Sequence, residues 1–139
     1  MRSELIDVAT GGREVVVDLT HRCEQFVAAE AHAAQGDGLL HIFVPHATAG
    51  IAILETGAGS DTDLLAVLVE LLPRDFGWQH RHGSPGHGRD HVLPALIPPY
   101  ASVPVVGGRL ALGTWQSICL VDTNVDNPDR KVRLSWLPG

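Results

Sequence analysis

Short apolar runs separated by glycine and proline limit the folds that this chain can adopt. Two longer segments with helical spacing lie among β-type runs, which cover residues 4–8, 14–18, 39–44, 49–54, 102–106, 109–112, 117–121 and 131–136. The predicted elements therefore come in the order strands, helix, strands, helix, strands. This order predicts an α+β fold in which helices cover a largely antiparallel sheet. No apolar run approaches the roughly 18 residues of a membrane-spanning helix.

Three helices are expected from spacing and end signals. The first is predicted from Thr20, as its N-cap, to about residue 35, with an apolar stripe that includes Cys23 and Ala31. The second should begin with a capping box at 60–63 and end before Pro73. A third, short helix is predicted over 91–97, where prolines limit its length.

Two Gly-Gly pairs are typical of tight hairpin turns. Residues 11–12 separate the runs 4–8 and 14–18, and residues 107–108 separate the runs 102–106 and 109–112. Because glycine adopts the positive φ angles of such turns, we expect a β-hairpin at each pair.

Composition excludes several classes of protein. The chain has 139 residues and a net charge of −6, which indicates one domain over 1–139 and disfavours nucleic acid as a partner. Residues 1–10 do not resemble a secretory signal, and no membrane partner is expected. The two cysteines, Cys23 and Cys119, are expected to be reduced and buried in a cytoplasmic protein.

Histidine is the distinctive residue of this sequence. The chain holds eight, and four of them, His80, His82, His87 and His91, lie in one loop rich in glycine. Neutral imidazole is a common metal ligand, and a flexible loop can direct several rings to one point. A solvated loop in which histidine replaces other polar residues explains the spacing equally well.

Further candidate site residues follow predicted strands. Thr48, in the turn that begins at His46, offers a hydroxyl and backbone amides to a phosphate or an oxyanion. Glu55 can act as a base or orient a metal-bound histidine, although an exposed strand end is the simpler interpretation. Arg130 can neutralise an anionic substrate or belong to a charged strand face. Between two strands lie Gly113, Thr114, Trp115 and Gln116, which suit either a stacked ring or a simple bend.

Taken in order, these segments resemble the YjbQ family, described broadly as secondary thiamine-phosphate synthase enzymes. The most specific parts are the Gly-Thr-Trp-Gln stretch and three histidines in sequence. The matching positions are residues 46–49, Glu55, residues 63–64, Pro73, residues 78–80, His91, residues 104–105, 108–110 and 112–116, Pro128 and Arg130. The chain departs from the pattern at Leu54 and Arg89, and at Pro98 and Pro99.

The resemblance implies an α+β fold of antiparallel sheets, sandwich-like, with two main helices and one short helix, that assembles as a homotrimer. It implies that His46, His80 and His91 converge near a subunit boundary around a divalent metal ion, Zn²⁺ or Mg²⁺, or around an anion. It leaves His82 and His87 in supporting or bystander roles. The small chain also favours a site that a neighbouring subunit completes.

The implied reaction joins a pyrimidine methyl diphosphate to a thiazole phosphate and releases diphosphate. In that reading Glu55 is a base or an orienting group, and Thr48 and Arg130 help to hold the small phosphorylated substrate. Trp115 would stack the pyrimidine and Gln116 would fix it. Two alternatives remain open: a metal-dependent hydrolase of a small phosphorylated or acyl compound, and a non-catalytic trimer that binds a metal or an anion.

Overall fold

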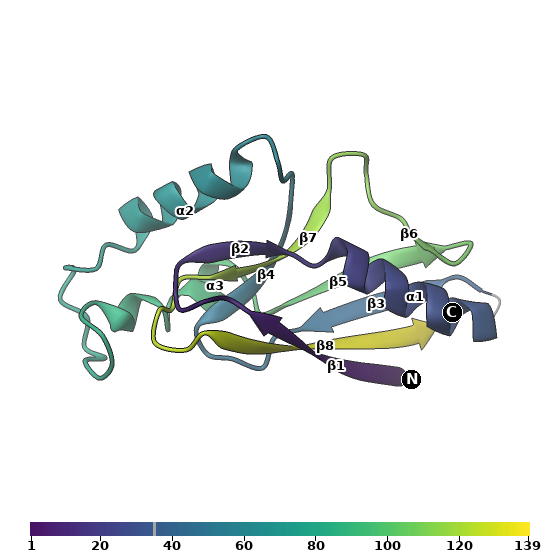
Figure 1. The fold of residues 1–139 in the computed structure, drawn as a ribbon, viewed down its shortest axis with the longest axis horizontal. Coiled ribbons are helices and arrows are strands. Elements are labelled where there is room, and N and C mark those ends of the chain that lie inside the picture. The colour runs from purple at the N-terminus through teal and green to yellow at the C-terminus, as the bar shows by residue number, and fades with distance from the viewer. Residues whose placement is uncertain (35) are drawn as a thin grey trace.

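Two antiparallel sheets contribute side chains to a shared core (Figure 1). The computed structural model describes residues 1–34 and 36–139, with the backbone alone for residues 31–34. The larger sheet has the strand order β1 (Arg2–Ala9), β8 (Asp129–Pro138), β3 (Gly38–Phe43), β5 (Tyr100–Val106) and β6 (Arg109–Leu110). The smaller sheet has the order β2 (Val15–Asp18), β7 (Ser117–Asp122) and β4 (Ala49–Leu54). The predicted α+β fold is confirmed.

Alternating side chains explain how the sheets pack. In β8, Val132, Leu134 and Trp136 point into the core, whereas Lys131 and Arg133, on either side of Val132, are exposed. The strand β7 is instead apolar on both faces. Its Ile118 and Leu120 join the main core, while Val121 joins a second cluster on the other face of the smaller sheet. The smaller sheet is therefore the middle layer.

The helices lie on different parts of this framework. The main core receives Cys23, Phe26 and Val27 from α1 (Thr20–Ala34). The second cluster receives Leu68 from α2 (Ser60–Leu71) and Leu93 from α3 (Leu93–Leu96). Figure 1 shows α2 at the side of the molecule opposite the two chain ends. In the described part of the chain, no helix is long and apolar enough to cross a membrane.

One of the two predicted hairpins is wrong. The pair 107–108 does join β5 to β6, and Val106 lies opposite Arg109. The pair 11–12 instead carries the chain from the larger sheet to the smaller one, because β1 pairs with β8 and β2 pairs with β7. The amides of Thr10 and Gly11 bind the carbonyl of Pro128, which fixes this crossing.

Two predicted helix caps also differ from the structure. The hydroxyl of Thr20 accepts the amide of Ile118, and Asp18 accepts the amide of Thr20 at 2.8 Å. The second helix begins after Gly59, whose φ of 104° is left-handed, and no side chain caps it. The third helix covers only Leu93–Leu96. The predicted end of the first helix at residue 35 and the Ala31 side chain lie outside the described residues.

Candidate functional site

A polar cluster forms where β4 begins and β7 ends. Ala49 lies opposite Asp122 in the β4–β7 ladder, so Thr48 is brought next to the residues that follow β7. The Nε atom of Arg130 lies 2.7 Å from Oδ2 of Asp122, and both side chains are almost fully buried. The Thr48 hydroxyl oxygen accepts from Asn124 at 3.3 Å and from Arg130 at 3.5 Å. Two predicted site residues, Thr48 and Arg130, therefore contact each other.

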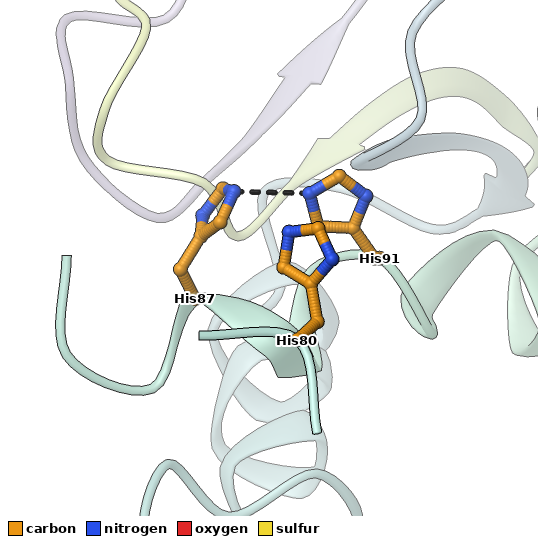
Figure 2. A group of neighbouring side chains, drawn as sticks. All are labelled: His80, His87 and His91. Atoms are coloured by element: carbon orange, nitrogen blue, oxygen red, sulfur yellow. Dashed lines mark hydrogen bonds between the residues drawn. The ribbon is translucent and has the colours of Figure 1, made fainter. Parts of the chain in front are cut away.

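Three histidines of the glycine-rich loop converge beside this cluster (Figure 2). One potential ligand atom from each of His80, His87 and His91 lies within 4.8 Å of the other two. The Nε2 atoms of His87 and His91 are 3.0 Å apart. Nε2 of His80 is buried and has no hydrogen-bond partner among the described residues. This group could hold a metal ion.

The fourth histidine of the loop lies next to the same group. The ring of His82 is exposed, and its centroid is 3.9 Å from that of His80. Its ring is also 5.7 Å from His87 and 5.9 Å from His91. All four histidines that the sequence placed in one loop thus occupy one small volume.

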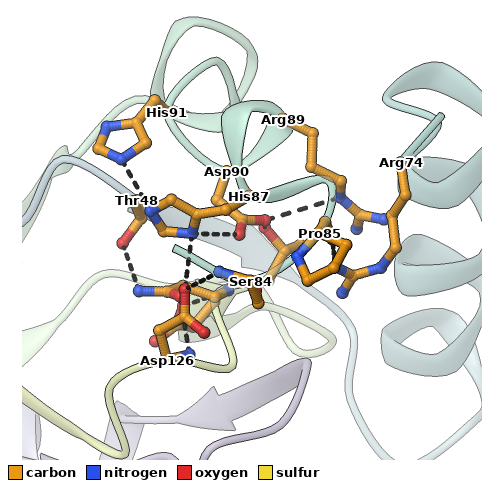
Figure 3. Close-up of polar contacts among 12 residues, drawn as sticks. Thr48, Arg74, Ser84, Pro85, His87, Arg89, Asp90, His91 and Asp126 are labelled. Atoms are coloured by element: carbon orange, nitrogen blue, oxygen red, sulfur yellow. Dashed lines mark hydrogen bonds and ion pairs between the residues drawn. The ribbon is translucent and has the colours of Figure 1, made fainter. Parts of the chain in front are cut away.

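Two carboxylates contact His87 on the Nδ1 side of its ring (Figure 3). Its Nδ1 atom lies 3.2 Å from Oδ2 of Asp90 and 3.2 Å from Oδ2 of Asp126. Asp90 is fully buried and also accepts the hydroxyl of Thr123 at 2.7 Å. Asp126 accepts the backbone amide of Ser84 at 3.0 Å. Both contacts fix the carboxylates, and the carboxylates fix the ring.

The histidine loop is anchored by a buried arginine. Arg89 lies in a 3₁₀ turn, η1 (His87–Arg89), and its side chain is 1% exposed. Its Nη2 donates to Oε1 of Glu14 at 2.7 Å, and Arg74 reaches the same oxygen at 3.0 Å. Because Glu14 directly precedes β2, this contact ties the loop to the smaller sheet.

The surroundings of His80 and His91 favour their neutral form. Burial and the neighbouring imidazoles lower the pKa of His80 and of His91 below the ordinary value of 6.5. Burial raises the pKa of Asp90, and the donors that face it oppose this effect. The backbone amide of Ser84 lowers the pKa of Asp126. Neutral imidazole is the form that binds metal ions.

A cavity of about 270 Å³ opens next to the histidines. His80 and His87 form part of its wall, together with the cationic side chains of Arg74 and Arg81. Trp78 also lines it, and its indole is fixed by donating to the carbonyl of Pro73 at 2.9 Å. Asp75 adds one carboxylate to the wall, so the two arginines leave an excess of positive charge that suits a small anionic ligand.

Comparison with known proteins identifies the family. The model for the UPF0047 protein YjbQ-like family matches residues 4–139. The chain belongs to this YjbQ-like family. It is 56% identical to a UPF0047 protein of Mycobacterium tuberculosis, over the full length of both chains.

Two solved structures share the fold of this chain. A YbjQ-like protein of Sulfolobus solfataricus superposes with a TM-score of 0.89 at 28% identity and covers 99% of this chain and 97% of its own. A protein of Aeropyrum pernix gives a TM-score of 0.85 at 33% identity, with full coverage of both chains.

The third histidine suggested by the YjbQ resemblance, His46, has a different partner. Its Nε2 accepts the backbone amide of Lys131 at 3.0 Å. Burial and the charges of Arg130 and Lys131 lower its pKa. Among the described residues, His87 converges with His80 and His91, and His46 lies outside that group.

The remaining predicted residues lie at the opposite end of the smaller sheet. Glu55 follows β4 where Leu54 pairs with Ser117, five residues beyond the Ala49–Asp122 pair. At about 3.3 Å per residue this is roughly 17 Å along the strands. The loop of Gly113, Thr114, Trp115 and Gln116 precedes Ser117 at this same end. Trp115 is 72% exposed, and Gln116 accepts the amide of Gly113 at 2.7 Å.

Sequence reasoning missed the residues that support the histidines. Asp90 and Arg89 stand beside His91 in the sequence, and this proximity was a signal that could have marked them. Asp126 and Glu14 lie far from the loop in sequence, and no local pattern indicates their role.

Proposed function

We propose that this protein is a metal-dependent enzyme that acts on a small phosphorylated compound. The observation that carries this proposal is the convergence of His80, His87 and His91, two of which, His80 and His87, line a cavity together with Arg74 and Arg81. The residues fit a metal ion, because all three donors are imidazole nitrogens and Nε2 of His80 has no other partner among the described residues. The proposal includes a cytoplasmic location, as expected from the sequence.

The first candidate reaction is that of a thiamine-phosphate synthase-like transferase. The bond between the pyrimidine methylene carbon and the diphosphate oxygen breaks, and both electrons leave with diphosphate. The thiazole nitrogen then forms a bond to the methylene carbon. A metal ion held by the histidines would supply positive charge to the leaving group.

The chain's own residues perform the other tasks. The guanidinium groups of Arg74 and Arg81 attract the phosphate groups and neutralise their charge. The Thr48 oxygen accepts from Asn124 and Arg130, which leaves the hydroxyl hydrogen to donate to a substrate oxygen.

The proposal includes a homotrimer in which a neighbouring subunit completes the site. Glu55, Trp115 and Gln116 lie beyond the Leu54–Ser117 pair, which is itself roughly 17 Å along the strands from the Ala49–Asp122 pair next to Thr48, so one subunit does not bring them to its own histidines. A second copy could supply them, with Trp115 stacking the pyrimidine. Mixing inactive Trp115→Ala and His80→Ala subunits should then restore part of the activity, and a failure to do so would count against a shared site.

The direct test is synthesis of thiamine phosphate by the purified protein. The two precursors are supplied with Mg²⁺ or Zn²⁺, and the product is measured by chromatography. We expect activity that His80→Ala abolishes and that His21→Ala, at an exposed position on α1, leaves unchanged. An absence of product with either metal would refute this reaction.

A metal-dependent hydrolase is the second candidate. Three histidines beside a cavity would hold a zinc ion and leave room for a water molecule on it, which is the donor set of hydrolytic zinc sites. A screen of phosphoesters and acyl esters would detect this activity, and turnover that persists in His80→Ala would argue against it. Metal binding without any turnover would favour the non-catalytic trimer.

A further inference from the structure

We infer that His80, His87 and His91 form a site for a borderline divalent metal ion of the Zn²⁺ class, with Asp90 and Asp126 as the residues that position His87. The inference deepens the proposed function, on whose metal ion it rests. It assigns the third ligand to His87, a residue to which the family resemblance gave only a minor role.

The donor atoms favour Zn²⁺ over Mg²⁺. All three side chains of the group offer imidazole nitrogen, and each has one such atom within 4.8 Å of the others. Imidazole suits Zn²⁺ and its neighbours in the first transition row, whereas Mg²⁺ prefers oxygen ligands and keeps several waters. A nitrogen-only donor set therefore discriminates strongly between the two metals that the sequence left open.

The partners of His87 determine which of its nitrogens is available. Nδ1 faces the carboxylates of Asp90 and Asp126 at 3.2 Å each, and carboxylates only accept hydrogen bonds. Nδ1 must therefore carry the hydrogen, and in the neutral ring Nε2 keeps its lone pair. That Nε2 lies 3.0 Å from Nε2 of His91, as two ligands of one ion would be placed (Figure 2).

The same carboxylates balance the charge of the ion. A divalent cation in a half-buried site needs negative charge nearby, because burial removes the water that would otherwise solvate it. Asp90 and Asp126 stand directly behind a ligand, which is the usual place for carboxylates that orient and strengthen a metal-bound histidine (Figure 3). Thr123 and Ser84 hold the two carboxylates in turn.

His46 does not offer the same arrangement. Its Nε2 lone pair already accepts a hydrogen bond from the amide of Lys131. Arg130 and Lys131 also place positive charge close to the ring. Positive neighbours repel a cation, whereas His87 has two negative ones. The local charges thus favour His87 over His46 as the third ligand.

The experiment measures metal binding to the metal-free protein without substrate. Zn²⁺ and Mg²⁺ are titrated against a chromophoric chelator, and Co²⁺ is added to read the coordination from its visible spectrum. We expect tight Zn²⁺ binding and at least ~100-fold weaker Mg²⁺ binding. Comparable affinity for both metals, or no Zn²⁺ binding, would overturn the inference. Zn²⁺ binding without turnover would instead refute only the proposed function.

Matched variants test the ligand set. We expect Asp90→Asn and Asp126→Asn each to lower Zn²⁺ affinity by about 10–100-fold, and His87→Asn to lower it further. His46→Gln should bind Zn²⁺ like the unmodified protein, as should the surface control His21→Gln. Weak binding by His46→Gln with normal binding by His87→Asn would overturn the assignment. Asp126 is partly exposed, so its variant remains informative if the buried Asp90→Asn fails to fold, and circular dichroism checks folding.

Discussion

The contact between Glu14 and Arg89 offers a demanding test of how the histidine loop is held. Arg89 is 1% exposed and Glu14 is 24% exposed, and their charged atoms are 2.7 Å apart. In Glu14→Gln the carboxylate charge is lost while the side chain keeps its shape. The only other carboxylate near Arg89 among the described residues is Asp90, at 3.6 Å.

The expected loss follows from the burial of the arginine. Removing one partner of a buried ion pair costs about 3–5 kcal/mol, and the partial exposure of Glu14 and its retained amide oxygen reduce this to about 2–3 kcal/mol. For a chain of 139 residues the unfolding entropy is about 0.3 kcal/mol per kelvin at the midpoint. The midpoint temperature should therefore fall by about 7–10 °C.

Urea unfolding followed by circular dichroism measures this free energy. Arg74→Gln is the matched control, because it removes a 40% exposed partner of the same carboxylate and should cost less than about 1 kcal/mol. In an Arg89→Met background, Glu14→Gln should also cost far less, since no buried charge is then left unpaired. Equal losses in Glu14→Gln and Arg74→Gln, or an unchanged loss in the Arg89→Met background, would refute the reasoning.

Three other outcomes are expected. In Gly88→Ala the new Cβ would lie 2.7 Å from the carbonyl oxygen of His80. The free energy of unfolding should therefore fall by about 1–3 kcal/mol, and Zn²⁺ affinity should fall in metal titrations; wild-type values of both would contradict this. Burial and nearby positive charge lower the pKa of His46, so the unfolded chain binds more protons below pH 6.5 and stability is lost as pH falls. His46→Gln should therefore flatten the dependence of Tm on pH between 7 and 5, and an unchanged slope would count against this cause. Burial raises the pKa of Cys23 and Cys119 to about 12, so neither thiol should react with Ellman's reagent until urea unfolds the protein; rapid reaction of the native protein would disprove it.

Local patterns predicted the strands well and their pairing poorly. The strand β4 has the predicted bounds, since apolar residues followed by a glycine-rich turn define it locally. The hairpin at residues 107–108 is confirmed because its two strands meet through the turn itself. The hairpin at 11–12 is wrong because its strands find partners more than a hundred residues away, and such partners leave no local signal.

The candidate site was only partly predictable for the same reason. The density of histidines in one loop indicated that several rings would meet, and His80 and His91 do lie together. Asp126 lies in the loop after β7, and the fold brings this loop to His87. The spacing of residues along the sequence does not predict that contact. Resemblance grouped Glu55 and Trp115 with the histidines, although the register of β4 and β7 separates them within one chain.

The strand order also sets when the protein can fold during synthesis. The strand β8 lies between β1 and β3, and β7 lies between β2 and β4. The larger sheet thus lacks β8, and the smaller sheet lacks β7, until the last part of the chain has left the ribosome. Until then β1 and β3 have unpaired edges, which invite wrong pairing between nascent chains. Ribosome-bound chains that stop before β7 should therefore remain sensitive to protease and depend on chaperones, and folding should complete only after β8 emerges.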